Sequence, residues 1–158
     1  MAEAWRVAAA VGAAAATGAA CYALGPRPKL PKLTWYDLEL AVCRMPSTAP
    51  WVAATPEGGD ATLFSVTKTM DELSLIVDAA HAPPPTDDCQ VEAGWAMFRL
   101  EGPLDFGLIG ILARIATVLA AEGISIFAVS TYDTDYVLVK KERRAAATAA
   151  LRAAGYSF

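Results

Sequence analysis

The stretch from Glu101 to Val139 limits the possible folds of this chain more than any other. It reads EGPLDFGLIGILARIATVLAAEGISIFAVSTYDTDYVLV, an apolar helical pattern followed by two short strand patterns with a polar turn between them. A strand pattern over 95–100 precedes it, and a helical pattern over 142–154 follows it before the terminal residues 156–158. The predicted order is therefore strand, helix, strand, strand, helix, strand. This order favours an α+β, ferredoxin-like βαββαβ unit, because a helix joins the first two strands and a hairpin joins the next two.

The first predicted helix covers 106–122, and Gly123 is suited to end it. Large apolar residues recur in it at spacings of three and four, the period of one helix face. They are Leu108, Ile111, Leu112, Ile115, Val118 and Leu119. Because charge is scarce in this helix, we expect it to be buried on more than one side, against its own sheet and against a second subunit or the other half of the chain. Strands are predicted over 124–129 and 135–139, joined by a turn over 130–134.

The wording GPLDFGLIGILA followed by ISIFAVSTYDTDYVLV resembles the ACT-domain family. Within that family it is similar to the small two-ACT amino-acid-binding proteins that include the CASTOR arginine sensors. The resemblance covers 33–158 and is strongest from Trp95 onward. It implies a C-terminal ACT domain over 91–158, packed with an abbreviated ACT-like unit over 33–80 and joined to it by a linker over 81–90.

The first half of the chain predicts strands over 33–44, 62–67 and 73–77. Thr69 and Glu72 have the spacing of a capping box, in a connection long enough for one helical turn at most. No long helix pattern separates the first two strands. We therefore expect this unit to be completed by elements of the second.

Residues 1–32 form an alanine-rich low-complexity extension and a proline-rich linker. Residues 7–25 carry no charge and are long enough to cross a membrane, but alanine and glycine contribute little transfer free energy. A low-complexity extension, a membrane anchor or uncleaved signal, and a processed targeting peptide all remain open. Membrane association through 7–25 is possible but not favoured, and the expected localisation is cytoplasmic.

Composition argues against several classes of function. A formal charge of −4 and a pI near 4.9, with no basic stripe, argue against nucleic acid as a partner. The three cysteines are far apart and odd in number, which suggests buried or incidental thiols, and His81 stands alone, so no metal site is predicted. The sequence has neither a nucleophile elbow nor a phosphate-binding loop. We expect no catalytic residues and no cofactor.

A free amino acid needs a carboxylate for its ammonium and free backbone N–H groups for its carboxylate. The segment 105–111 enters the first helix with two glycines, and the turn 130–135 supplies hydroxyls and two aspartates. Asp105 could instead be the N-cap of the helix, and Asp133 and Asp135 could simply close the hairpin turn. Both alternatives remain open at the level of sequence.

The resemblance implies that the ligand lies between the two ACT units. Its implied contacts are Ser65 and Val66 in the first unit, Asp105, Phe106, Gly107, Ile109, Gly110 and Ile111 in the loop before the helix, and Thr131, Tyr132, Asp133, Thr134 and Asp135 in the hairpin. Asp135 is the implied acidic anchor. Arginine-sensing members carry a further acidic residue at the position that Leu108 occupies here, which implies a smaller or more apolar ligand side chain.

The sequence thus leads to a non-catalytic amino-acid-binding sensor or regulatory protein, with a small-molecule amino acid and a homo-oligomer or protein partner. The alternative is a structural or assembly module, or a regulatory subunit of an amino-acid biosynthetic enzyme.

Overall fold

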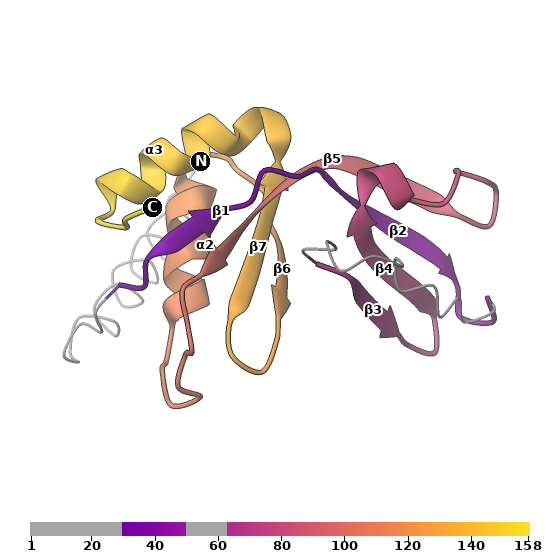
Figure 1. Cartoon of the computed structure of the whole chain (residues 1–158), viewed down its shortest axis with the longest axis horizontal. Coiled ribbons are helices and arrows are strands. Elements are labelled where there is room, and N and C mark those ends of the chain that lie inside the picture. The colour runs from indigo at the N-terminus through magenta and orange to yellow at the C-terminus, as the bar shows by residue number, and fades with distance from the viewer. Residues whose placement is uncertain (1–29, 50–62) are drawn as a thin grey trace, which may run out of the picture.

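The computed structural model describes residues 30–49 and 63–158 of this chain (Figure 1). The predictions for the N-terminal extension over 1–29 lie outside this range. Seven strands of the described residues form one antiparallel sheet in the order β3-β4-β2-β5-β7-β6, with β1 also paired to β5. Their bounds are β1 Leu33–Trp35, β2 Leu40–Pro46, β3 Ser65–Lys68, β4 Glu72–Asp78, β5 Gln90–Leu100, β6 Phe127–Ser130 and β7 Asp135–Lys140.

Two α-helices cover one face of this sheet beside β1, β5 and β7 (Figure 1). They are α2, Ile111–Ala121, and α3, Arg144–Ala153. The short 3-10 helix η1, Ala79–His81, follows β4, and η2, Lys141–Arg143, lies directly before α3. The sheet and helix side chains that interlock in this core are Phe98, Leu100, Val137, Val139, Ile115, Leu119, Ala147 and Leu151, each fully buried. The α+β, ACT-like architecture predicted from the sequence is confirmed.

Strand β5 contributes side chains to two hydrophobic cores, one on each face of the sheet. Its alternation places Phe98 under the helices, whereas Trp95 and Met97 lie on the other face, as the period-2 pattern predicts. On that second face Met97 packs with Leu138 of β7 and with Leu40 of β2. In Figure 1, β5 runs from the part that carries the helices to the part formed by β2, β4 and β3.

The prediction of a single strand over 33–44 is wrong, because the chain leaves the sheet between β1 and β2. Both pieces pair with the same edge of β5, Leu33 opposite Leu100 and Leu40 opposite Trp95. The pairing of β2 with β5 also shifts its register near Leu40, so one regular strand cannot follow β5 throughout.

The prediction of a final strand over 156–158 is also wrong. Strand β1 occupies the edge of β5 where the last strand of a βαββαβ unit would lie, and the backbone N–H of Leu33 donates to the carbonyl of Ser157 at 2.8 Å. The C-terminal residues therefore lie next to β1, and Tyr156 packs into the core. The N-terminal part of the chain thus completes the C-terminal unit, so the two are interleaved.

The strands predicted over 62–67 and 73–77 correspond to β3 and β4, which are joined by a tight turn. The hydroxyl of Thr69 accepts hydrogen bonds from the N–H groups of Asp71 and Glu72, both at 3.1 Å. The spacing that suggested a capping box therefore stabilises a hairpin turn. The division of the chain into units at 33–80 and 91–158 remains a prediction, since the sheet runs through both.

Cys43 and Cys89 are buried free thiols, as expected, while Cys21 lies outside the described residues. Burial, with a smaller contribution from the neighbouring Cys89, raises the pKa of Cys43 to about 11. The thiolate form of Cys43 is therefore scarce at neutral pH. Among the helices of residues 30–49 and 63–158, none is long and apolar enough to cross a membrane.

Candidate functional site

The loop between β5 and α2 and the hairpin between β6 and β7 meet at one end of the sheet. Two hydrogen bonds of Asp133 and Thr134 join them, and a glycine allows their close approach. The hydroxyl of Thr134, which is 8% exposed, donates to the carbonyl of Leu100 at 2.5 Å. The N–H of Leu104 donates to the carbonyl of Asp133 at 2.8 Å. A Cβ at Gly102 would lie 2.7 Å from that carbonyl oxygen, so only glycine lets the two segments approach so closely.

The loop before α2 folds into a turn of its own. The N–H of Gly107 donates to the Asp105 carboxylate at 2.6 Å, and the N–H of Leu108 donates to the Asp105 carbonyl at 3.0 Å. Helix α2 then begins at Ile111, with Gly110 as its N-cap at φ 80°. The prediction that this helix begins at residue 106 is wrong by five residues. The alternative in which Asp105 is the N-cap is also wrong, because Gly110 has that position.

The start of α2 consequently has no side-chain cap. The N–H of Arg114 makes the bond to the Gly110 carbonyl, at 3.0 Å, that closes the first turn. The N–H groups of Ile111, Leu112 and Ala113 come before this bond, as do the first N–H groups of any α-helix. They carry the positive end of the helix dipole, which favours an anion.

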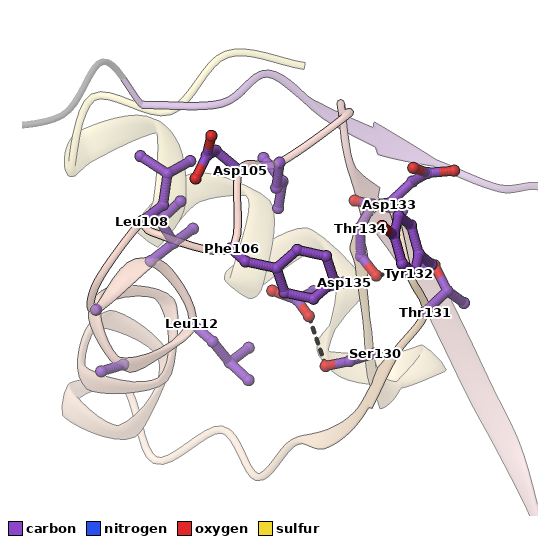
Figure 2. A pocket seen from close by; sticks show the side chains of 14 residues that line it. Asp105, Phe106, Leu108, Leu112, Ser130, Thr131, Tyr132, Asp133, Thr134 and Asp135 are labelled. Carbon is purple, nitrogen blue, oxygen red and sulfur yellow. Dashed lines mark hydrogen bonds between the residues drawn. The ribbon is translucent and has the colours of Figure 1, made fainter.

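The hairpin places a single carboxylate toward the loop. Ser130 and Asp135 are opposite each other in β6 and β7, and the Ser130 hydroxyl donates to the Asp135 carboxylate at 2.6 Å. Figure 2 shows the Asp135 carboxylate between Phe106 and Ser130, in the middle of the cleft, whereas the Asp133 side chain points away from it. The turn itself is closed by Thr131, whose N–H and hydroxyl both donate to the Thr134 carbonyl, at 2.8 and 3.1 Å. Asp135 is therefore not the residue that closes the turn.

A cleft of about 410 Å³ lies between these two walls (Figure 2). At its mouth the rings of Phe106 and Tyr132 meet edge to face, with centroids 5.1 Å apart and planes at 79°. The lining residues are Leu104, Asp105, Phe106, Leu108, Gly110, Ile111, Leu112, Ala113, Ser130, Thr131, Tyr132, Asp133, Thr134 and Asp135. Most residues that the sequence proposed for the site are thus brought together.

Four proposed residues do not line this cleft. Gly107 and Ile109 belong to the same loop, but Ile109 is 86% exposed and stands outside the cavity. Ser65 and Val66 lie in β3, which is the outermost strand at the end of the sheet opposite β6. Their role in ligand binding remains a prediction, and within one chain β3 contributes nothing to the cleft wall.

Sequence reasoning did not include Leu104, Leu108, Leu112, Ala113 and Ser130 among the implied contacts. Leu112 fits the apolar face of a helix, so its spacing indicated only a core position. It does pack against the core, yet it also faces the cleft because α2 begins there. Ser130 could have been found from its place one residue before the chosen turn segment, because it is the direct partner of Asp135 in the hairpin.

The chemistry of the cleft suits a small ligand with both charges. Three aspartates but no lysine are among its lining residues, so a cation is favoured over an anion on the hairpin side. The free N–H groups of α2 favour a carboxylate on the other side. A volume of about 410 Å³ lies in the range of small-molecule sites. In the part of the chain that the structure describes, no three His, Cys, Asp or Glu side chains gather as a metal site would require.

Comparisons with known proteins place this fold and cleft in context. An ACT-domain family model matches residues 90–153. A protein of solved structure from Agobacterium tumefaciens is 32% identical, with a TM-score of 0.70, over 84% of this chain and 92% of its own. The regulatory subunit of aspartate kinase from Thermus thermophilus has a TM-score of 0.54 at 16% identity, over 80% of this chain and 99% of its own, and shows the fold alone.

The "Cytosolic arginine sensor for mTORC1 subunit 1" of Homo sapiens is 32% identical over 95 residues, which are 57% of this chain. The proteins of that name in Pongo abelii and Bos taurus match at 32% and 30%. The matched region spans only 29% of the length of these relatives. The family match over 90–153 and the similarity to the Agobacterium tumefaciens structure agree with the resemblance of the sequence, and this chain belongs to the ACT-domain family.

Proposed function

We propose that this protein is a non-catalytic amino-acid-binding regulatory protein and that its ligand occupies the cleft between the loop before α2 and the β6–β7 hairpin. One observation carries the proposal. The Asp135 carboxylate and the uncapped start of α2 line the same cleft from opposite walls. The first suits an ammonium group and the second a carboxylate, and a free α-amino acid carries both within a few bonds.

The relatives support a regulatory role. The mammalian relatives are named as arginine sensors. The word cytosolic in the sensors' name supports a cytoplasmic location for this protein. Because the matched region spans 29% of those sensors, we propose for this chain only amino-acid binding and a change in its contacts with a partner.

Regulation requires the partner to distinguish the two states of the protein. An amino acid in the cleft changes partner affinity only if the partner binds the liganded and the empty forms with different free energies. The cleft mouth is where the two forms would differ most, since Phe106 and Tyr132 are 76% and 80% exposed there. A ligand that fills the cleft would order this aromatic pair.

A second function is favoured by the exposed apolar side chains around the cleft. Phe106, Leu108, Ile109 and Tyr132 form a group of large apolar residues on the surface. Such a group is typical of protein interfaces. The protein would then be an assembly module, as a homo-oligomer or as a regulatory subunit of an amino-acid biosynthetic enzyme, and its cleft would be covered by protein.

The test is a thermal-shift screen of the full chain against the twenty amino acids, followed by calorimetric titration. We expect a saturable rise in Tm with a subset of amino acids, because a ligand that binds only the folded state stabilises it. Asp135→Asn keeps the size of the side chain and removes its charge, and we expect it to weaken binding about tenfold or more.

Asp133→Asn is the matched control, because Asp133 lies two residues away in the same hairpin but points away from the cleft. Its affinity should stay within about twofold of the unaltered protein. If no amino acid raises Tm, the amino-acid function is wrong and the assembly module becomes the better proposal. An equal loss of affinity in both variants would show that the total negative charge of the hairpin determines binding and that Asp135 is not a specific anchor.

A further inference from the structure

We propose that the cleft selects amino acids with uncharged, apolar side chains and discriminates against those with cationic side chains, such as lysine and arginine. The inference rests on the proposed function and specifies its ligand class. It follows from where the charges and the apolar surfaces of the cleft lie relative to each other.

Only one of the three aspartates of the cleft is directed into it. The Asp135 carboxylate lies in the middle of the cleft beside Ser130 (Figure 2). The Asp105 carboxylate is folded back onto the N–H of Gly107 at 2.6 Å, beside Leu108. The Asp133 side chain points away from Phe106 and Asp135. The cavity therefore offers one anionic group to one cationic group.

An α-amino acid uses that single carboxylate for its ammonium group. The remaining surface of the cavity is mainly apolar. Phe106 extends toward Tyr132 across the mouth, and Leu112 extends into the same space from the first turn of α2 (Figure 2). Leu104 and Ile111 continue this surface, and both pack against the helical core. A ligand side chain that leaves the Asp135 and α2 walls has to pass along this apolar surface.

Binding of a cationic side chain to such a surface is unfavourable. Its charge would lose water without gaining a carboxylate, and this desolvation is unfavourable. An alkyl side chain of the same length gains from the transfer out of water. The Gly107 N–H holds the Asp105 carboxylate at the turn before α2, beside Leu108 and away from Asp135. The cleft geometry thus favours an alkyl side chain over one of the same carbon length that ends in an ammonium group.

The experiment compares L-norleucine with L-lysine on the full chain by calorimetric titration. These two amino acids have the same four-carbon side chain, and lysine adds a terminal ammonium group. We expect norleucine to bind about tenfold more tightly or better. L-leucine and L-arginine form a second pair, with leucine expected to bind more tightly.

Two variants of the loop test the cause. Phe106→Ala removes a ring of the apolar surface at a site that is 76% exposed, so folding is not at risk. It should weaken norleucine binding about fivefold to tenfold and leave lysine binding nearly unchanged, which lowers the ratio of the two affinities. Ile109→Ala removes an exposed apolar side chain from the same loop outside the cleft, and it should leave the ratio unchanged.

The outcomes separate this inference from the proposed function. Binding of lysine or arginine as tight as that of norleucine would overturn the selectivity but leave an amino-acid site in place. An affinity ratio that stays the same in Phe106→Ala would also overturn it, because the apolar surface would not be its cause. Failure of all four amino acids to bind, together with failure of the wider screen, would overturn the proposed function itself.

Discussion

At the scale of single residues, the Glu101 carboxylate is bound both by a residue distant in the sequence and by one close to it. Thr34 in β1 donates its hydroxyl to the Glu101 carboxylate at 2.5 Å, and Arg99 in β5 contacts the same carboxylate at 2.9 Å. The hydrogen bond from Thr34, and then the one from Arg99, lower the pKa of Glu101 below its ordinary value. This cluster fastens β1 to the end of β5, directly before the loop that forms one wall of the cleft.

The lowered pKa of Glu101 predicts the sign of a pH effect. A carboxyl group whose pKa is lower in the folded state stabilises it above the unfolded pKa of about 4.3, and this contribution is lost as pH falls through the folded pKa. We expect Glu101→Gln to be less stable than the unaltered protein at neutral pH, with a difference that shrinks below about pH 4. Urea unfolding at a series of pH values measures both the stability difference at neutral pH and its decrease at low pH.

Thr34→Val separates the cause from other acid effects. It removes the first donor to Glu101 and keeps the carboxyl group, so the pH dependence assigned to Glu101 should become weaker but remain. A stability difference between Glu101→Gln and the unaltered protein that is the same at every pH would contradict this assignment.

At the scale of elements, the approach of the loop to the hairpin defines the cleft. Gly102 is the point of closest contact, because an added Cβ would lie 2.7 Å from the backbone oxygen of Asp133. Gly102→Ala must push one segment from the other, since neither partner is a flexible side chain. We expect it to lower the free energy of unfolding by about 1–3 kcal/mol, the usual effect of overpacking, and to weaken ligand binding.

Gly107→Ala in the same loop is the control for Gly102→Ala. Its nearest contact would be the end of the Asp105 side chain at 3.0 Å, which can move aside. Urea unfolding should show a much smaller loss for Gly107→Ala. Equal losses would mean that the loop tolerates no side chain anywhere and that the approach to Asp133 is not special.

The elements also show what the sequence could and could not reveal. The alternation in β5 and the apolar spacing of α2 come from local patterns, and both were predicted correctly. The start of α2 was placed too early because Leu108 and Ile109 continue the helical spacing, although Ile109 is 86% exposed in a loop. The spacing of apolar residues cannot distinguish an exposed loop from a buried turn.

The exchange of the final strand for β1 could not be predicted from pattern. Leu33–Trp35 and 156–158 are each three residues long, and either could pair with β5. The choice depends on tertiary contacts, among them the Trp35 indole N–H, which donates to the Thr148 hydroxyl at 2.9 Å. For the candidate site, the amino-acid sequences of the loop before α2 and of the β6–β7 hairpin identified the segments that line the cleft. Which aspartate faces the cleft depended on the register of Ser130 with Asp135.

At the scale of the whole molecule, β5 joins two cores on opposite faces of one sheet. Phe98 and Met97 are consecutive residues, both fully buried, and they point into different cores. A strand shared in this way should couple the two cores. If so, the part formed by β2, β3 and β4 and the part that carries the helices unfold together.

Two substitutions in β5 test this coupling. Phe98→Ala should lower the free energy of unfolding by about 3–5 kcal/mol and Met97→Ala by about 2–5 kcal/mol, as large-to-small changes in cores do. Under two-state unfolding, each variant should shift a single transition that far-UV and near-UV circular dichroism report at the same urea concentration. Trp95 and Trp35, in the Met97 and Phe98 cores respectively, contribute to the near-UV signal. A variant that moves one spectroscopic transition and leaves the other in place would show two independent units. Coincident transitions would mean that ligand binding at the hairpin end stabilises β2, β3 and β4 as well, because the shared strand links their unfolding.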